Sequence, residues 1–330
     1  MKKLVDKKGR VRFGIFDEPV ETVNYLDYPL RTPMGYKFPS WMRRIRANQF
    51  CFVGIPGRDF TVGLAVVDLH TVASGFFYVC ERASGRIVET SALCLPKKNI
   101  FIDPRPDRVK ARFRSRKLSM ELDSGIISAR GRGISLNARM GLDDINPLRI
   151  CTRTDYRGWA YVQKTNPVKI SGKLGFEGKT LPVSQHEYMA SIDWTAGYMR
   201  RKTWWNWLSA SGTLPGGRAF GINLSCGVNE TSFTENFFVI DRQMTKVDTV
   251  YFDFDSDDFF KPWRICSFDG KVDLRFLPEA YRGEKLSAIV LASRFSQLAG
   301  TCEGMLKTDS GEEVAVEDVA GLAEDHYAKW

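Results

Sequence analysis

The chain has 330 residues, more than one hydrophobic core usually serves, so we expect two domains or two halves of one large β structure. With 43% hydrophobic and 26% charged residues, its composition is typical of a folded soluble protein and excludes a disordered chain. Because there is neither a run of about eighteen apolar residues nor a secretory signal, we expect no membrane span and no export.

The seven cysteines are scattered and lie mostly within apolar runs. An odd number without regular spacing does not favour a disulfide framework. We therefore expect reduced core thiols and a cytoplasmic location.

In chain order, the first predicted element is a short helix over 41–49, capped by Ser40. Trp41 and Ile45 share one face of this helix, and its three arginines face outward. Runs of alternating residues between turn signals then predict the strands of the first half: 50–56, 60–69, 73–82, 86–95, 108–115, 117–122, 126–130 and 133–139. Asp123-Ser124-Gly125 is typical of a hairpin turn, because these residues tolerate positive φ.

The net charge of +9 is concentrated in one alternating run, where five cations recur at every second residue: Arg108, Lys110, Arg112, Arg114 and Arg116. On a strand they share one face. That face is either the solvated outside of an antiparallel sheet or a docking patch for acidic lipid headgroups, nucleic acid or an anionic ligand. No aromatic residues alternate within the face, so nucleic acid is the least favoured partner.

The second half repeats this pattern of short strands: 156–164, 168–176, 203–209, 219–226, 233–240, 246–254, 263–268, 271–277, 287–294, 300–307 and 312–317. A second helix is expected over 319–329. Phe268-Asp269-Gly270-Lys271 is typical of a two-residue hairpin.

Many strands without interleaved helices indicate an all-β protein with antiparallel neighbours, of the sandwich or barrel type. We expect two β-barrel or sandwich halves, residues 1–155 and 156–330. The passages Asp143–Pro147 and Thr165–Pro167 both carry the composition of a boundary.

An aromatic cluster in Thr203-Trp204-Trp205-Asn206-Trp207 is the most informative motif. On a strand, Trp205 and Trp207 lie on the same face as Thr203, and Trp204 and Asn206 lie on the other. Indole rings beside carboxylates and amides suit a pocket for a hydrophobic small molecule, because burial supplies binding and a few polar groups fix orientation.

Four polar residues near the cluster are candidates for chemistry. Asp193, beside Trp194, is either a proton donor or acceptor whose pKa is raised by apolar surroundings, or a turn residue bonded to its own backbone. Glu235 is either a site acid or half of a buried pair with an arginine. Asn223 satisfies either a backbone group or a ligand oxygen, and His186 is either a surface-loop residue or a general base. His70 and His326 belong to no visible constellation.

Several kinds of site are excluded by spacing. No two histidines or cysteines have metal-ligand spacing, and neither a P-loop nor a dinucleotide-binding signature occurs. We therefore expect no metal and no other cofactor.

The second half also carries motifs that resemble the bacterial family known as domain of unknown function 2804: Asp193-Trp194, the aromatic run 203–207, Phe220–Leu224, Glu235-Asn236, Pro262-Trp263, Phe276–Pro278 and Gln297–Gly300. Gly321 and Glu324 fit the same pattern, as does an opening stretch near 14–27. The resemblance covers essentially the whole chain and implies no activity. Members of that family resemble more distantly the carotenoid hydratase and lipocalin-like two-domain proteins, which implies a tandem calycin-like fold that holds a lipophilic ligand.

From these observations we expect an apolar small molecule, such as a lipid, isoprenoid or polyketide, to bind in an aromatic-lined β pocket. Either the protein is a cofactor-free acid/base enzyme of the hydratase, isomerase or cyclase type, or it is a non-catalytic carrier or sensor. A peripheral protein that docks on anionic membrane through the strand 108–116 is a third hypothesis. The candidate catalytic residues are Asp193, Glu235 and His186. The candidate ligand-binding residues are Trp194, Trp204, Trp205, Asn206, Trp207, Asn223, Asn236, Trp263 and Gln297.

Overall fold

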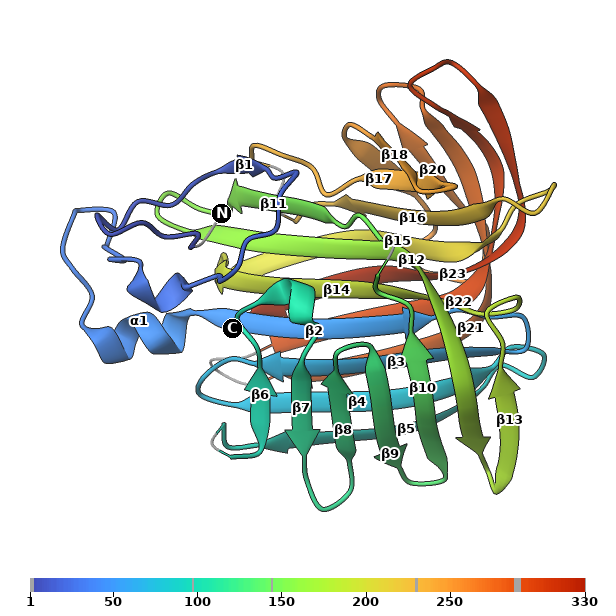
Figure 1. The fold of residues 1–330 in the computed structure, drawn as a ribbon, viewed down its shortest axis with the longest axis horizontal. Helices are drawn as coiled ribbons and strands as arrows, with labels where there is room; N and C mark the ends of the chain where they lie inside the picture. The colour runs from blue at the N-terminus through green and yellow to red at the C-terminus, as the bar shows by residue number, and fades with distance from the viewer. Residues whose placement is uncertain (1–2, 97, 144, 229–230, 288–291, 330) are drawn as a thin grey trace.

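The computed structural model describes residues 3–96, 98–143, 145–228, 231–287 and 292–329. Within these residues the protein is almost entirely antiparallel β structure, as Figure 1 shows. The helical segments are short: α1 (Ser40–Arg46), and the 3-10 turns η1 (Tyr25–Asp27) and η2 (Pro106–Arg108). No helix in this part of the chain has the length and apolar character needed to cross a membrane. The all-β prediction is confirmed.

The first sheet has fourteen strands among the described residues. Its main path has the order β5-β4-β3-β2-β14-β12-β10-β9-β8-β7-β6, with β11 and β13 also paired to β12, and β1 paired to β11. The strands are β1 (Gly14–Ile15), β2 (Asn48–Ile55), β3 (Phe60–Asp68), β4 (Ala73–Glu81), β5 (Arg86–Cys94), β6 (Ile100–Ile102), β7 (Ala111–Arg114), β8 (Ser119–Asp123), β9 (Ile126–Gly131), β10 (Ile134–Met140), β11 (Leu148–Arg153), β12 (Trp159–Phe176), β13 (Lys179–Val183) and β14 (Met189–Tyr198).

The second sheet has nine strands among the described residues, in the order β18-β17-β16-β15-β23-β22-β21-β20-β19. They are β15 (Lys202–Thr213), β16 (Ala219–Cys226), β17 (Phe237–Ile240), β18 (Gln243–Lys246), β19 (Val250–Asp253), β20 (Trp263–Ser267), β21 (Val272–Ser287), β22 (Ala292–Lys307) and β23 (Glu313–Lys329).

Each sheet curls around its own hydrophobic core (Figure 1). Successive side chains of a strand point to opposite faces, so one face of each sheet supplies the core and the other faces outward. The first core includes Phe113 and Trp194, and the second includes Phe220 and Trp263. The outer faces of the two sheets pack against each other through a smaller apolar cluster, in which Phe52 and Tyr78 of the first sheet meet Trp207 and Leu322 of the second. The predicted two antiparallel halves are therefore present.

The two sheets divide between Tyr198, where β14 ends, and Lys202, where β15 begins. The expected boundary at residue 155 falls between β11 and β12, which pair with each other in the first sheet. Strands β12 and β14 thus complete the first half and place their outer faces against the second.

The predicted helix over 319–329 is wrong, because this segment is the C-terminal part of β23. Its three alanines and its glutamate favour helix in isolation. Here the segment pairs with β15 on one side and with β22 on the other, and two ladders of backbone hydrogen bonds outweigh the local preference.

Other predicted elements need correction. The range 108–115 contains the end of η2 and the short strand β7, because Val109 adopts a left-handed conformation with φ of 43°. Strand β14 was not predicted, and the range 246–254 contains the last residue of β18 and the whole of β19. The predicted strands 156–164 and 168–176 form one strand, β12, and the range 271–277 continues to Ser287 in β21. Residues 288–291 of the predicted strand 287–294 lie outside the described residues.

Two predicted turns are confirmed. Ser124 and Gly125, both with positive φ, connect β8 to β9, and Asp123 pairs with Ile126 across the turn. Gly270, with φ of 71°, lies in the connection between the paired strands β20 and β21. All seven cysteines are free.

Helix α1 is shorter than predicted, and its apolar face is not buried. Pro39 is its N-cap residue instead of Ser40, and no side chain caps it. Trp41 and Ile45, four residues apart on one face, are 62% and 42% exposed.

Candidate functional site

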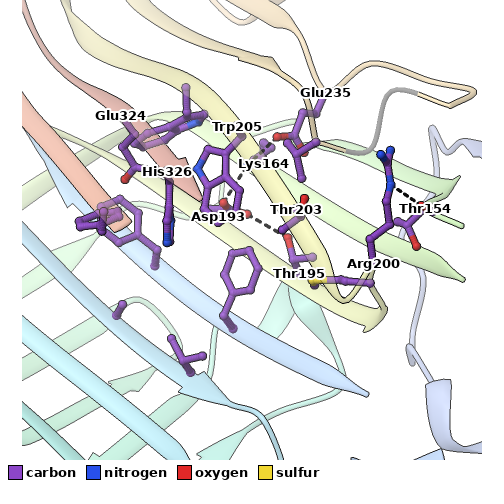
Figure 2. A pocket seen from close by; sticks show the side chains of 18 of the residues that line it. Thr154, Lys164, Asp193, Thr195, Arg200, Thr203, Trp205, Glu235, Glu324 and His326 are labelled. Atoms are coloured by element: carbon purple, nitrogen blue, oxygen red, sulfur yellow. Dashed lines mark hydrogen bonds and ion pairs between the residues drawn. The ribbon is translucent and has the colours of Figure 1, made fainter. Parts of the chain in front are cut away.

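A cavity of about 180 Å³ lies between the two sheets, and we call it the interface pocket. Figure 2 shows side chains from both sheets pointing into it. Its lining residues are Phe50, Phe52, Ala65, Val67, Phe76, Thr154, Lys164, Asp193, Thr195, Met199, Arg200, Thr203, Trp205, Trp207, Val228, Glu235, Phe295, Glu324 and His326. Ligand sites often occur where two packed units meet.

Strand alternation decides which residues reach the pocket. In β14, Asp193 and Thr195 point out of the first sheet toward the second, whereas Trp194 points into the first core. In β15, Trp205 and Trp207 face the pocket together with Thr203. The predicted division of the aromatic run into two faces is therefore confirmed.

Three charged residues form a buried cluster on one side of the pocket, which we call the lysine triad: Lys164, Asp193 and Glu235. Lys164 Nζ lies 2.6 Å from Asp193 Oδ2 and 3.3 Å from Glu235 Oε1, and Thr195 Oγ1 donates to Asp193 Oδ1 at 3.2 Å. Lys164 and Glu235 are buried, and Asp193 is half-buried. A buried charge is tolerated only when it is paired in this way.

Within the lysine triad, the ammonium group of Lys164 holds its proton more tightly than a free lysine does. Burial disfavours the ammonium of Lys164, but Asp193 and Glu235 outweigh this effect and raise its pKa. Burial also raises the pKa of Glu235, against the opposing effect of Lys164, and the charge of Asp193 adds to the rise. Lys164 is therefore held as the cation between the two carboxyl groups of the triad.

Glu324 is a second buried carboxyl of the pocket, and no ion pair joins it to a cation among the described residues. Trp205 Nε1 donates to its Oε2 at 3.0 Å, and Gln297 Nε2 donates to its Oε1 at 2.6 Å. Burial raises the pKa of Glu324 to about 7, although both hydrogen bonds oppose the rise. Glu324 therefore exchanges a proton near neutral pH, the range suited to a general acid or base.

His326 lies two residues further along β23 and points into the same pocket (Figure 2). Its ring centroid is 4.1 Å from that of Trp205 and 4.8 Å from that of Phe295. Its Nε2 is 3.0 Å from Ser293 Oγ, and its Nδ1 is buried without a hydrogen-bond partner among the described residues. Burial, with Arg282 nearby, lowers its pKa to about 3, so the imidazole is neutral.

Aromatic rings form the apolar wall of the pocket. Phe52 makes an edge contact with Trp207 at 5.8 Å between centroids and lies 6.3 Å from Phe76. Trp207 Nε1 donates to Asn223 Oδ1 at 2.9 Å, which fixes the indole. Lys164 Nζ lies 5.9 Å from the centre of the Trp207 ring. Ring faces of this kind stabilise positive charge on a ligand.

Four of the predicted site residues line the pocket: Asp193, Glu235, Trp205 and Trp207. Three others support it from behind. Asn223 accepts from Trp207 and donates to the Glu235 carbonyl, Asn236 bonds backbone groups of Ser225 and Asp248, and Gln297 bonds Glu324. Glu235 is half of a buried pair, as one hypothesis held, but its partner is a lysine instead of an arginine.

The remaining predicted residues lie elsewhere. His186 is an exposed residue between β13 and β14, and Trp204 is 51% exposed on the far face of β15. Asn206 donates to Asp325 at 3.0 Å on that same face. Trp194 and Trp263 are buried in the two cores, where Trp263 stacks on Phe254 at 4.0 Å.

Sequence reasoning missed Lys164, Glu324 and His326. The motif resemblance included Glu324, but the predicted helix hid the alternation that turns both β23 residues inward. Lys164 ends a predicted strand, where a lysine normally faces solvent. Among the residues that the structure describes, no group of three histidine, cysteine or acidic side chains is placed to hold a metal ion.

The family described as "Domain of unknown function (DUF2804)" matches residues 1–330. No curated protein matches the chain significantly. Among solved structures, the chain is similar to an AttH candidate from Nitrosomonas europaea, with a TM-score of 0.51 and 11% identity over 85% of this chain and 92% of that one. At this identity the likeness shows the fold alone.

Two further solved structures share the arrangement of strands more loosely. Kievitone hydratase from Nectria haematococca has a TM-score of 0.48 and 10% identity over 86% of this chain and 88% of its own. CghA with Sch210972 has a TM-score of 0.49 and 10% identity over 94% and 97%. We draw no conclusion about function from either likeness.

Proposed function

This chain belongs to the DUF2804 family, and we propose that it binds an apolar small molecule in the interface pocket and transfers a proton to or from a carbon atom of that molecule. The observation that carries the proposal is Glu324, a buried carboxyl with a pKa of about 7 beside the rings of Trp205 and His326.

Glu324 acts as the proton donor in this proposal. The electron pair of a carbon–carbon double bond takes the proton of the carboxyl, a new C–H bond forms, and Glu324 becomes a carboxylate. Trp205 Nε1 and Gln297 Nε2 donate to the carboxylate oxygens and stabilise the charge that forms there. The cation left on the ligand lies against the faces of Trp205 and Trp207, which stabilise it.

The second step decides the reaction type. If water adds to the cation and gives its proton back to Glu324, the result is hydration. If the cation instead returns a neighbouring proton to the Glu324 carboxylate, the result is isomerisation. If a second double bond attacks the cation, a ring and a new cation form, and loss of a proton from that cation to Glu324 completes cyclisation. The lysine triad holds fixed charges on the other side of the pocket and orients a polar group of the ligand. This hydratase, isomerase or cyclase chemistry needs no cofactor.

The proposal is tested with the ligand that copurifies with the expressed protein, identified by mass spectrometry after extraction. Wild-type protein incubated with this ligand in heavy water introduces deuterium bound to carbon. Glu324→Gln retains the ligand and loses deuterium incorporation, whereas Glu317→Gln, on an exposed position of the same strand, retains both. Incorporation at the wild-type rate in Glu324→Gln would remove Glu324 from the mechanism.

A non-catalytic carrier is the alternative function. It requires the aromatic wall but no exchangeable acid, so the ligand copurifies and no deuterium enters it even with the wild-type protein. A Trp207→Ala variant that retains a normal amount of ligand argues against both functions.

A further inference from the structure

The segment between η1 and β2 exposes large apolar side chains. Met34 is 82% exposed, Tyr36 75%, Trp41 62% and Ile45 42%. Single exposed apolar residues are common on protein surfaces, but a group of them within twelve residues marks an interaction site. Trp and Tyr are also the side chains that favour the boundary between lipid headgroups and acyl chains.

Along the sequence, cations accompany these apolar residues and acids do not. Between Asp27 and Asp59 the chain has no acidic residue. The ion pairs found among the described residues include none of the five cations between Asp27 and β2: Arg31, Lys37, Arg43, Arg44 and Arg46. We call residues 31–46 the α1 surface. Its positive charge is complementary to an anionic partner.

Hydrogen bonds from arginine side chains to backbone carbonyls hold the α1 surface in place. Arg43 donates to the carbonyls of Leu26 and Tyr28 at 3.1 and 3.0 Å, and Arg31 donates to the Gly35 carbonyl at 2.8 Å. Arg46 stacks on the Phe38 ring at 4.5 Å. The exposed Trp41 and Ile45 therefore project from an ordered segment.

Helix α1 lies at one end of the molecule, beside the start of β2 (Figure 1). Helix α1 leads directly into β2, whose Phe50 lines the pocket. Tyr198 OH donates to the Tyr25 carbonyl at 3.2 Å, and the next residues along the chain, Met199 and Arg200, also line the pocket. The α1 surface is therefore connected through β2 and Tyr198 to residues that line the pocket.

The strand carrying the basic alternation offers less free charge. Lys110 Nζ lies 2.6 Å from Asp123 Oδ2, and Arg114 Nη2 lies 3.0 Å from Glu121 Oε2, so neighbouring carboxylates on β8 offset these cations. Its register also places Arg112 opposite Glu121. The basic run 108–116 therefore serves as the control surface in the test of the α1 surface.

We propose that the α1 surface docks the protein on a bilayer that contains anionic lipid. Trp41 and Ile45 enter the headgroup region, and Arg44 and Arg46 bind the lipid phosphates and carboxylates. This inference goes beyond the proposed proton transfer and does not depend on it, because docking is measured without any ligand of the pocket.

The test is co-sedimentation with vesicles of phosphatidylcholine and phosphatidylserine, beside vesicles of phosphatidylcholine alone. Wild-type protein binds the anionic vesicles, and high salt weakens the binding. Arg44→Gln with Arg46→Gln lowers the affinity by roughly tenfold to thirtyfold, since each cation near the surface contributes to attraction. Trp41→Ser with Ile45→Ser lowers it as well. Arg112→Gln with Arg114→Gln retains the wild-type affinity.

A second readout places the contact directly. Brominated lipid quenches the fluorescence of Trp41 when this side chain enters the bilayer. Wild-type protein therefore shows quenching, and Trp41→Phe does not. Thermal melting shows that each variant is folded, which these exposed positions permit. The proposal fails if wild-type protein ignores anionic vesicles at low salt, or if the Arg112 and Arg114 pair lowers the affinity as much as the α1 pair. It also fails if short DNA duplexes bind more tightly than the vesicles.

Discussion

The two carboxyl clusters of the interface pocket differ in what compensates their burial. In the lysine triad, one ammonium contacts both Asp193 and Glu235. Glu324, on β23 of the second sheet, receives its side-chain hydrogen bonds within the described residues from the neutral donors Trp205 and Gln297. A buried ion pair fixes its charges, whereas a carboxyl among neutral donors remains free to gain and lose a proton. The triad is therefore the structural and orienting part of the site, and Glu324 is the exchangeable one.

The largest expected effect breaks the triad. Lys164→Met leaves Asp193 and Glu235 buried without their cation, which costs about 3–5 kcal/mol of unfolding free energy. Urea unfolding measures it. Lys173→Met, at an exposed position of the same strand, changes stability by about 0.5 kcal/mol or less. A loss in Lys164→Met as small as that of Lys173→Met would show that the triad contributes nothing.

The second-largest expected effect is a pH dependence of stability that distinguishes Glu324 from the lysine triad. The pKa of Glu324 rises from 4.5 to about 7 in the folded protein, so its proton is bound more tightly there than in the unfolded chain. This contribution to stability is complete below about pH 4.5 and is lost as the pH rises to about 7, up to about 3 kcal/mol.

Glu324→Gln removes that dependence and keeps the shape of the site, because the Gln297 amide can turn and accept from the new amide. The variant is thus more stable than wild-type protein at neutral pH and equal to it in acid. His326, whose lowered pKa acts in the opposite direction, is present in both proteins and cancels. Urea unfolding at a series of pH values measures the free energy of unfolding of both proteins. If the two free energies change in parallel across this pH range, the raised pKa of Glu324 is refuted.

A smaller effect separates the two faces of β15. Trp207→Phe leaves the buried Asn223 Oδ1 without its donor, which costs about 1–3 kcal/mol. It also weakens binding of the copurifying ligand. Urea unfolding and equilibrium dialysis measure the two changes, and similar losses in Trp204→Phe would contradict the assignment of faces.

The smallest expected effect is that of Trp204→Phe itself. Because Trp204 is 51% exposed on the face away from the pocket, stability changes by about 0.5 kcal/mol or less. Ligand binding, measured by equilibrium dialysis, stays at the wild-type level.

Much of the fold could be predicted because alternation is a local signal. The division of Trp205 and Trp207 from Trp204 follows from a period of two, and so does the all-β class. The terminal strand could not be read in this way, because Ala323 and Ala328 favour helix and only pairing with β15 and β22 makes the segment extended.

The site required knowledge of long-range packing. Asp193 and Glu235 were singled out because they lie beside aromatic residues in sequence. Lys164 faces outward from the first sheet, and only the second sheet that covers it makes its charge buried. The inward direction of Glu324 and His326 follows from the alternation of β23, and the sequence predicts a helix in that segment.

The most direct test of the account is the protonation state of Glu324. The infrared difference spectrum between wild-type protein and Glu324→Gln isolates the C=O stretch of this one carboxyl. The account predicts that the protonated band persists above pH 4.5 and disappears with a midpoint near pH 7. A carboxylate band already complete at pH 4.5 would contradict it.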